Sequence, residues 1–486
     1  MDENLKQKAI LGVFWQAIQR FGSRVILFVA NMVFARLLSP DDFGCMGIIW
    51  VFLSFSDIFI NGGFGSALIQ KKDISENDYS TAFYWNFIIA FLCYCILYFC
   101  APSIADFYST PILSEALRVQ GLVLFFNSLC VVQVSRLYKQ LKFKKIAIID
   151  VVASILGSAI GIFCAYLGLG VWSFVIKMLS YGVINSILIW ISAKWCPNFV
   201  FSLASFKKLF GFGSFMFLSS LTNVLFINFQ SLIIGKMFTM KDLAYYSQAR
   251  KLEEVPIVCL TNIISTVSYP VFSTLQEDKD MLLTCIRRNI KTITFLSFPL
   301  MTFFIVAAEP IIMCVFSEKW LPSVPYFQLL CLAGVLIPIN ITNRDFYAAI
   351  GRSKLFFNSQ LIYKLFGIGM MLIGIYSYGV TGLLIGKIIA DYCLFFMNAT
   401  ITGRLINYGV IRQIRDLATN LLISVFCGVL FHYIMKLYHS SSVWILLLEC
   451  LVFFTLYLSI AYIGKNNELF LYLNIIKNTI NKIRKH

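Results

Sequence analysis

Two arginines inside the first long apolar stretch are the residues whose type and spacing most directly predict binding chemistry. Arg20 and Arg24 are four residues apart, so a helix would place both on one face. A charge near the middle of a bilayer is costly and usually faces a bundle interior or a water-filled cavity. Guanidinium groups keep their protons and bind phosphate through two parallel hydrogen bonds. The pair therefore predicts a cationic cavity for a phosphate-bearing ligand, with a structural ion pair to Asp57 as the alternative.

Three lysines in later apolar stretches could extend such a cavity. Lys177 and Lys387 each follow a Gly-Val pair by about two helical turns. Asp391 lies four residues after Lys387 and could neutralise it, whereas Lys177 could instead extend toward the membrane surface. Lys364 is open to the same two interpretations, cavity lining or extension toward the surface.

Two carboxylates are candidates for coupling transport to an ion. Asp57 and Glu309 lie in apolar surroundings, where a proton or a sodium ion could be exchanged. Pairing with the arginines explains Asp57 equally well, and Pro310 beside Glu309 favours a structural role at a helix end. The 14 cysteines and 3 histidines show no metal-ligand spacing, so we expect neither a metal nor another cofactor.

The elements that must position these residues are membrane helices. Of the 486 residues, 59% are hydrophobic and 13% are charged, whereas soluble domains carry about 25% charged residues. Apolar runs of about 20 residues recur along the chain, and strand-length alternation is absent. The sequence therefore predicts an all-α polytopic membrane protein with about 14 transmembrane helices. We expect the helices at residues 10–35, 43–65, 82–101, 116–136, 147–167, 171–192, 211–236, 252–274, 291–314, 325–346, 356–376, 379–402, 416–436 and 443–463.

An internal repeat divides these helices into two sets. Residues 36–44 (RLLSPDDFG) and 236–244 (KMFTMKDLA) match position by position in residue type. The Gly-Val turns before Lys177 and Lys387 form a second match at a similar offset. Two such matches in one order predict two pseudo-symmetric six-helix lobes, a fold that places a substrate site between its halves. We expect an N-lobe at 1–200, a C-lobe at 201–405, two extra helices at 406–463 and an amphipathic tail at 464–486.

The basic residues give the orientation. The chain has 40 Lys and Arg against 24 Asp and Glu, a net charge of +16. Most of the cations fall in alternate loops, those that lie on the same side of the membrane as both termini. The positive-inside rule then places both termini in the cytoplasm. This distribution along the membrane normal explains the charge without nucleic acid, which we do not expect as a partner.

Four motifs resemble one family of membrane transporters. Residues 38–44 (LSPDDFG) resemble the loop after its first helix, and residues 63–70 (GFGSALIQ) resemble the end of its second. Residues 308–310 (AEP) and 316–325 (FSEKWLPSVP) resemble the stretch after its ninth helix, with Ser317 where glycine is expected. The resemblance is to the polysaccharide transporter branch of the MOP superfamily, nearest the Wzx-like colanic-acid exporters.

This resemblance covers residues 5–400 and implies a function. The family moves undecaprenyl-pyrophosphate-linked oligosaccharides from the cytoplasmic to the periplasmic leaflet of the bacterial inner membrane, by alternating access and without enzymatic chemistry. A polysaccharide polymerase outside the membrane is then a candidate partner. The alternatives are a peptidoglycan-precursor flippase, a cation-coupled multidrug exporter of the same superfamily, or a membrane enzyme of polysaccharide assembly. The short outer loops without a D-x-D motif disfavour the enzyme.

Overall fold

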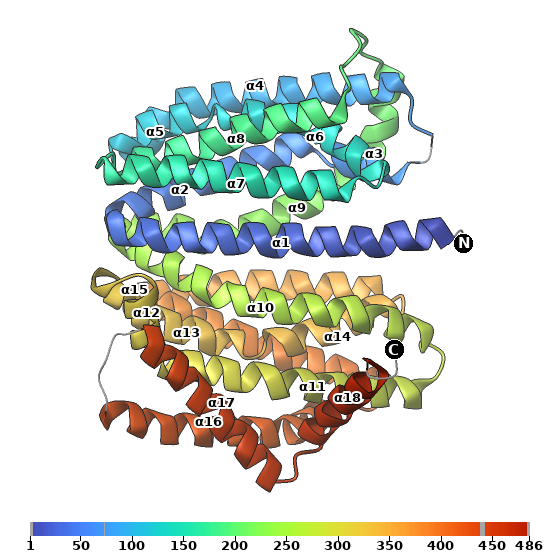
Figure 1. The fold of residues 1–486 in the computed structure, drawn as a ribbon, viewed down its shortest axis with the longest axis vertical. Coiled ribbons are helices and arrows are strands. Elements are labelled where there is room, and N and C mark those ends of the chain that lie inside the picture. The colour runs from blue at the N-terminus through green and yellow to red at the C-terminus, as the bar shows by residue number, and fades with distance from the viewer. Residues whose placement is uncertain (1–2, 72, 438–442, 484–486) are drawn as a thin grey trace. The chain divides into compact units, whose positions relative to one another are not determined.

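The computed structural model describes residues 3–71, 73–437 and 443–483, and the secondary structure of this part of the chain consists of helices, without β-strands (Figure 1). The prediction of an all-α protein is therefore confirmed. Contacts divide the chain into two compact units, Met1–Ala244 and Tyr245–His486. The helices of the first unit are α1 (Glu3–Leu37), α2 (Pro40–Asn61), α3 (Phe64–Gln70), α4 (Glu76–Phe107), α5 (Ile112–Gln120), α6 (Val123–Lys139), α7 (Phe143–Tyr166), α8 (Val171–Ala193) and α9 (Leu203–Met237).

The second unit holds the remaining helices, apart from the first turn of α10. They are α10 (Met240–Thr274), α11 (Lys279–Val306), α12 (Ala308–Val315), the 3₁₀ helix η1 (Glu318–Ser323), α13 (Val324–Gly334), α14 (Ile337–Ala349), α15 (Ser353–Ile406), α16 (Val410–Leu437), α17 (Val443–Ile463) and α18 (Asn467–Ile483).

Eleven helical stretches of the described residues are long and apolar enough to cross a bilayer. One of them, α15, contains two of the predicted helices, because Tyr378 and Gly379 leave the helical conformation inside it. Gly379 has φ +64°, which favours glycine, and the predicted turn between 356–376 and 379–402 lies there. The chain is thus a multi-pass membrane protein, while the count of fourteen spans stays a prediction.

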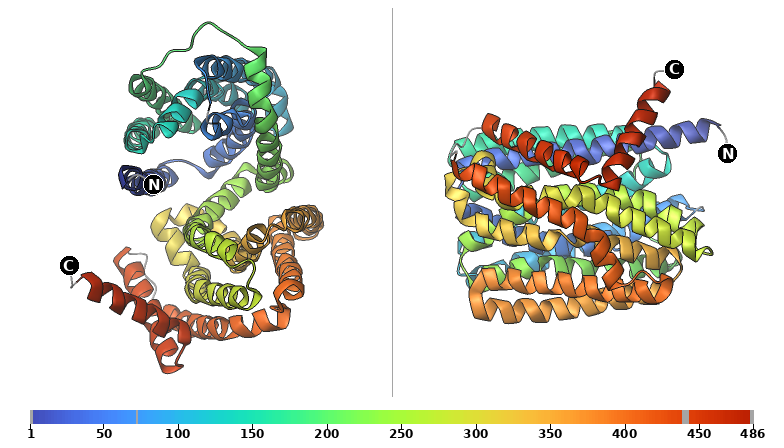
Figure 2. Two further views of the ribbon diagram at one scale, coloured as in Figure 1. Left: turned by 90° about the vertical axis from the view of Figure 1, so that its right-hand side faces the viewer. Right: turned by 90° about the horizontal axis from the view of Figure 1, so that it is seen from below.

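The first unit is built around neighbouring long helices. Helix α7 packs between α1 and α8, and α6 packs against α4 and α8. Figure 2 shows these helices end-on. Helix α9 packs against α2, α3 and α4, which is why contacts place it in the first unit. The lobe boundary expected at residue 200 comes from the repeat and stays a prediction.

The two repeated segments adopt the same local structure. Ser39 and Asp42 form a capping box at the start of α2, in which the Asp42 carboxylate accepts the Ser39 N–H at 3.0 Å. Thr239 and Asp242 form the same bonds at the start of α10, where the corresponding distance is 3.1 Å. The matched residue types thus stop one helix and start the next in both segments.

Helix α2 ends earlier than expected, because two consecutive residues leave the helical conformation. Gly62 has φ +49° and Gly63 has φ +76°, so the chain turns there and continues as the short helix α3. The predicted helix at 43–65 is therefore two elements. This break places the start of α3 beside α6.

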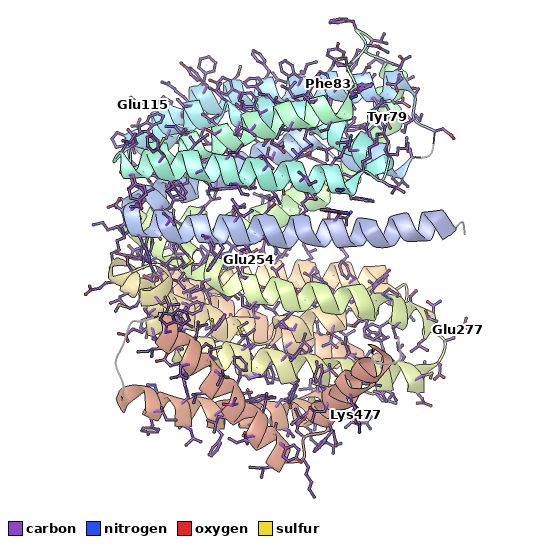
Figure 3. The ribbon with its side chains drawn as sticks, viewed as in Figure 1. Tyr79, Phe83, Glu115, Glu254, Glu277 and Lys477 are labelled. Atoms are coloured by element: carbon purple, nitrogen blue, oxygen red, sulfur yellow. The ribbon has the colours of Figure 1, made fainter. Side chains whose placement is uncertain are left out.

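An aromatic cluster closes one end of the first unit (Figure 3). The rings of Tyr79 and Phe83 on α4 lie 6.1 and 6.2 Å from the ring of Trp195. The Arg136 guanidinium lies 4.7 Å from the Tyr79 ring centroid and 2.8 Å from the Glu76 carboxylate. These contacts tie α4, α6 and the segment after α8 together.

In the second unit, α11 is the central helix and packs against α13, α14 and α16. Arg287 on α11 binds Asp416 on α16 through two bonds of 2.5 and 2.7 Å. The Tyr408 hydroxyl donates to the same carboxylate at 3.1 Å. Burial, together with the neighbouring Asp416 carboxylate, raises the pKa of Tyr408, so the phenol stays a donor.

Candidate functional site

Helices α1, α7 and α8 meet at a carboxylate that sequence reasoning missed. Asp150 on α7 accepts hydrogen bonds from Ser23 Oγ at 2.7 Å, from the Tyr181 hydroxyl at 2.7 Å and from Gln19 Nε2 at 3.5 Å. All three donors are neutral. A lone aspartate within the predicted apolar helix at 147–167 was the signal that could have identified it.

Arg24 lies one residue beyond Ser23 on α1, which turns its side chain by about 100° from the Asp150 junction. The side chain is exposed, and no described residue forms an ion pair or hydrogen bond with it. Arg20 belongs to α1 as well, but its side chain lies outside the described part of the structure. The structure thus leaves Arg24 available to an external anion.

Lys177 lies half-buried on α8, with its ammonium 5.0 Å from the centroid of the Phe34 ring on α1. An ammonium over an aromatic face is attracted by the ring quadrupole. Gly161 on α7 makes this placement possible, since a Cβ there would lie 2.5 Å from Lys177 Cβ. The position of Lys177 is therefore set by the close approach of α7 and α8.

Asp57 on α2 lines a cavity of about 470 Å³ within the first unit. Its Oδ1 accepts a hydrogen bond of 3.0 Å from Asn127 Nδ2 on α6. The alternative interpretation, an ion pair between Asp57 and Arg24, is not what the structure shows. The reason is the rotation of α2, which turns the carboxylate toward α6.

Lys387 in the second unit is paired within its own helix. Its Nζ lies 2.6 Å from Asp391 Oδ2, and the side chains are 17% and 4% exposed. The Tyr363 hydroxyl donates to Asp391 Oδ1 at 2.6 Å. The i+4 neutralisation considered from the sequence is therefore present, and this lysine is enclosed with its counter-ion.

The remaining two candidates lie apart from these groups. Lys364 is half-buried on the first arm of α15, one residue after Tyr363. Glu309 is exposed in the first turn of α12, where a carboxylate complements the positive end of the helix dipole. Within residues 3–71, 73–437 and 443–483, no three metal-ligating side chains come together.

Comparison with known sequences identifies relatives in polysaccharide synthesis. The chain is 26% identical over 356 residues to the teichuronic acid biosynthesis protein TuaB of Bacillus subtilis (strain 168), covering 73% of this chain and 74% of the relative. It is 26% identical over 353 residues to the succinoglycan biosynthesis transport protein ExoT of Rhizobium meliloti (strain 1021), covering 72% and 71%. It is 23% identical over 397 residues to the lipopolysaccharide biosynthesis protein WzxC of Escherichia coli (strain K12), covering 80% and 79%.

Comparison with solved structures identifies the fold. The lipid II flippase MurJ, in an inward closed conformation, superposes with a TM-score of 0.76 at 18% identity, covering 94% of this chain and 99% of that one. An inward-facing multidrug resistance transporter of the MATE family of the MOP superfamily gives 0.62 at 16% identity, covering 82% and 100%. The chain therefore has the fold of these two transporters, as the motifs predict.

The family is assigned from the sequence. The family model described as polysaccharide biosynthesis protein matches residues 33–325, more than half of the chain. This match contains all four quoted motifs whole, the last of which, residues 316–325, ends where the match ends. The chain belongs to the polysaccharide biosynthesis protein family.

Proposed function

We propose that this protein is a flippase for undecaprenyl-pyrophosphate-linked oligosaccharides. It would carry repeat units from the cytoplasmic to the periplasmic leaflet of the bacterial inner membrane, with both termini in the cytoplasm. The observation that carries the proposal is a polysaccharide-biosynthesis family match on a chain with the fold of a lipid flippase. The polymer names of the relatives, teichuronic acid and succinoglycan, support a glycan cargo.

The charges of the first unit suit such a cargo. A diphosphate must cross about 30 Å of hydrocarbon, so it needs a cationic, hydrated path. Arg24 on α1 is exposed and without a described partner. The Lys177 ammonium on α8 lies 5.0 Å from the centroid of the Phe34 ring, which belongs to the same helix as Arg24. We assign diphosphate binding to these two residues and to Arg20. Lys364 stays a further candidate, whereas the ion pair with Asp391 favours a structural role for Lys387.

The transport cycle requires no covalent chemistry, and we expect no cofactor. Coupling to a proton or a sodium ion through Asp57 or Glu309 stays a prediction. A polysaccharide polymerase remains the expected partner on the outer side, where it would consume the translocated units.

The test of the cargo uses a deletion strain. Mass spectrometry of its lipid extract should reveal an undecaprenyl-pyrophosphate oligosaccharide, inaccessible to probes added from the periplasmic side, together with loss of surface polymer. Accumulation of a peptidoglycan precursor would replace the proposed cargo with that lipid. Normal polymer and no trapped lipid, together with raised drug sensitivity, would favour a multidrug exporter.

The test of the cationic path uses Arg24. Arg24→Gln should lower surface polymer by about tenfold or more, because the bidentate bonds to phosphate are lost. Arg24→Lys should retain part of the export, because it keeps the positive charge but loses the planar guanidinium that binds phosphate through two hydrogen bonds. Arg288→Gln is the matched control, since Arg288 is also exposed and without a described partner but lies on α11. Normal polymer with Arg24→Gln at wild-type expression would remove Arg24 from the site.

A further inference from the structure

The cavity between α2, α3 and α6, which Asp57 lines, lies outside the proposed cationic path of Arg20, Arg24 and Lys177. We propose that it binds the sugar hydroxyls of the cargo, and this rests on the proposed function. Its volume of about 470 Å³ lies within the range of about 300–1,000 Å³ typical of small-ligand sites. The break at Gly62 and Gly63 creates it, because the chain turns away from α2 there before α3 packs on α6.

The carboxylate of Asp57 has one oxygen committed and one available. Its Oδ1 accepts the Asn127 amide at 3.0 Å, while Oδ2 accepts no hydrogen bond from any described residue. Oδ2 is also not sealed inside the protein, since Asp57 lines the cavity. An acceptor held in place by a neighbouring amide is suited to a ligand that donates hydrogen bonds, as a sugar hydroxyl does.

The negative charge of the cavity disfavours the diphosphate end of the cargo. Asp57 is the single charged side chain among its twelve lining residues. A carboxylate without a compensating cation repels a diphosphate but accepts hydrogen bonds from neutral hydroxyls. The cavity and the exposed Arg24 therefore have opposite preferences, one for a neutral donor and one for an anion.

The remaining lining residues offer both kinds of contact that a sugar ring needs. Asn61, Ser66 and Asn127 carry groups that can donate or accept hydrogen bonds. Val131 and Tyr138 supply apolar and aromatic surface for the C–H groups of the ring. A mixed lining of this kind, mostly apolar with a few polar groups, is the usual composition of small-ligand pockets.

The cavity also lies toward the side on which the cargo would load. Its lining includes Ser66 of α3 and Tyr138 in the last turn of α6, and the loops that follow these two helices carry Lys71 and Lys142. The positive-inside rule places these loops in the cytoplasm. The glycan would therefore be recognised before translocation, which would let the protein select completed repeat units.

The experiment compares two lipids on purified protein in lipid nanodiscs. The probes are undecaprenyl pyrophosphate and the undecaprenyl-pyrophosphate oligosaccharide isolated from the deletion strain, each titrated by native mass spectrometry. Wild type should bind the glycosylated lipid more tightly. Asp57→Asn should lower that preference by about tenfold, because the side chain loses its charge and one of its two acceptor oxygens is replaced by a donor, and should leave undecaprenyl pyrophosphate affinity unchanged. Asp106→Asn, an exposed aspartate at the end of α4, is the matched control and should change neither affinity.

A second variant keeps the test independent of the carboxylate. Ser66→Trp places bulk at an exposed lining position and should also remove the preference for the glycosylated lipid. If both variants keep the wild-type preference, the cavity is not the sugar site, although the flippase proposal stands. If wild type binds neither lipid, the proposed cargo fails and the sugar site fails with it. If Asp57→Asn keeps the preference but makes transport independent of the ion gradient, Asp57 couples an ion and the assignment is overturned.

Discussion

The α7–α8 hairpin of the first unit and the two arms of α15 in the second each tie an aspartate to a tyrosine, but with the partners exchanged. In the first unit Asp150 lies on the leading helix and Tyr181 on the following one, with 2.7 Å between them. In the second unit Tyr363 lies on the leading arm and Asp391 on the following one, at 2.6 Å. In both units a tyrosine hydroxyl thus donates to an aspartate on the neighbouring helix, but the order of the two residues along the chain is reversed.

This reversed order gives different surroundings to Lys177 and Lys387, the two lysines that the repeat matches. Lys387 lies four residues before an aspartate and forms a 2.6 Å ion pair with it. Lys177 lies four residues before Tyr181 and faces the Phe34 ring instead. A repeat can therefore preserve the position of a cation while its local surroundings differ. The ion pair with Asp391 is the reason that Lys387 is left out of the proposed anion path.

The largest effect that tests this comparison is expected at Asp391. Asp391→Ala should lower the free energy of unfolding by about 3–5 kcal/mol, because it leaves the enclosed Lys387 ammonium without its counter-ion. Denaturant titration in detergent measures it. The double variant Lys387→Met with Asp391→Leu should recover much of that stability, since both charges are removed together. A double variant as unstable as Asp391→Ala would show that the pair itself is not the cause.

The next effect concerns export. Lys177→Gln should lower surface polymer by about tenfold at unchanged expression, because the proposed diphosphate path loses a cation. The Lys387→Met, Asp391→Leu double variant serves as control and should export nearly as well as wild type. The reverse result would move the functional lysine to the second unit.

A smaller effect separates the two tyrosines. Tyr363→Phe should lower the free energy of unfolding by about 1–2 kcal/mol, in the range of interhelical hydrogen bonds in membranes. Tyr181→Phe should cost less, because Asp150 keeps Ser23 and Gln19 as donors. Equal losses of unfolding free energy in the two variants, measured by the same denaturant titration, would mean that Ser23 and Gln19 do not compensate for the missing tyrosine hydroxyl.

The smallest effect is expected at Ser23. Ser23→Ala should cost about 0.6 kcal/mol, the average for a single interhelical hydrogen bond in a membrane protein. The Tyr181→Phe, Ser23→Ala double variant completes a thermodynamic cycle. A loss greater than the sum of the two single losses would show that the donors compensate for each other around Asp150.

The prediction from sequence was best where it depended on composition and local pattern. The apolar runs predicted an all-helical membrane protein, and the repeat at 36–44 and 236–244 identified two segments that cap helices in the same way. It was weaker where a helix is interrupted, because the break at Gly62 and Gly63 lies inside a stretch that is apolar enough overall to be predicted as a single helix. It missed Asp150, because a single aspartate in an apolar helix does not reveal its partners.

The sequence by itself determined the class, the family motifs and the positions of the intramembrane charges, since hydropathy and short motifs are local properties of the chain. Only the tertiary structure decided which charges have partners. Asp57 bonds to Asn127 and Asp150 to Ser23 and Tyr181, residues between 31 and 127 positions away. Periodicity gives the face of a helix on which a residue lies, but the neighbour of that face depends on how the helices rotate and pack against each other.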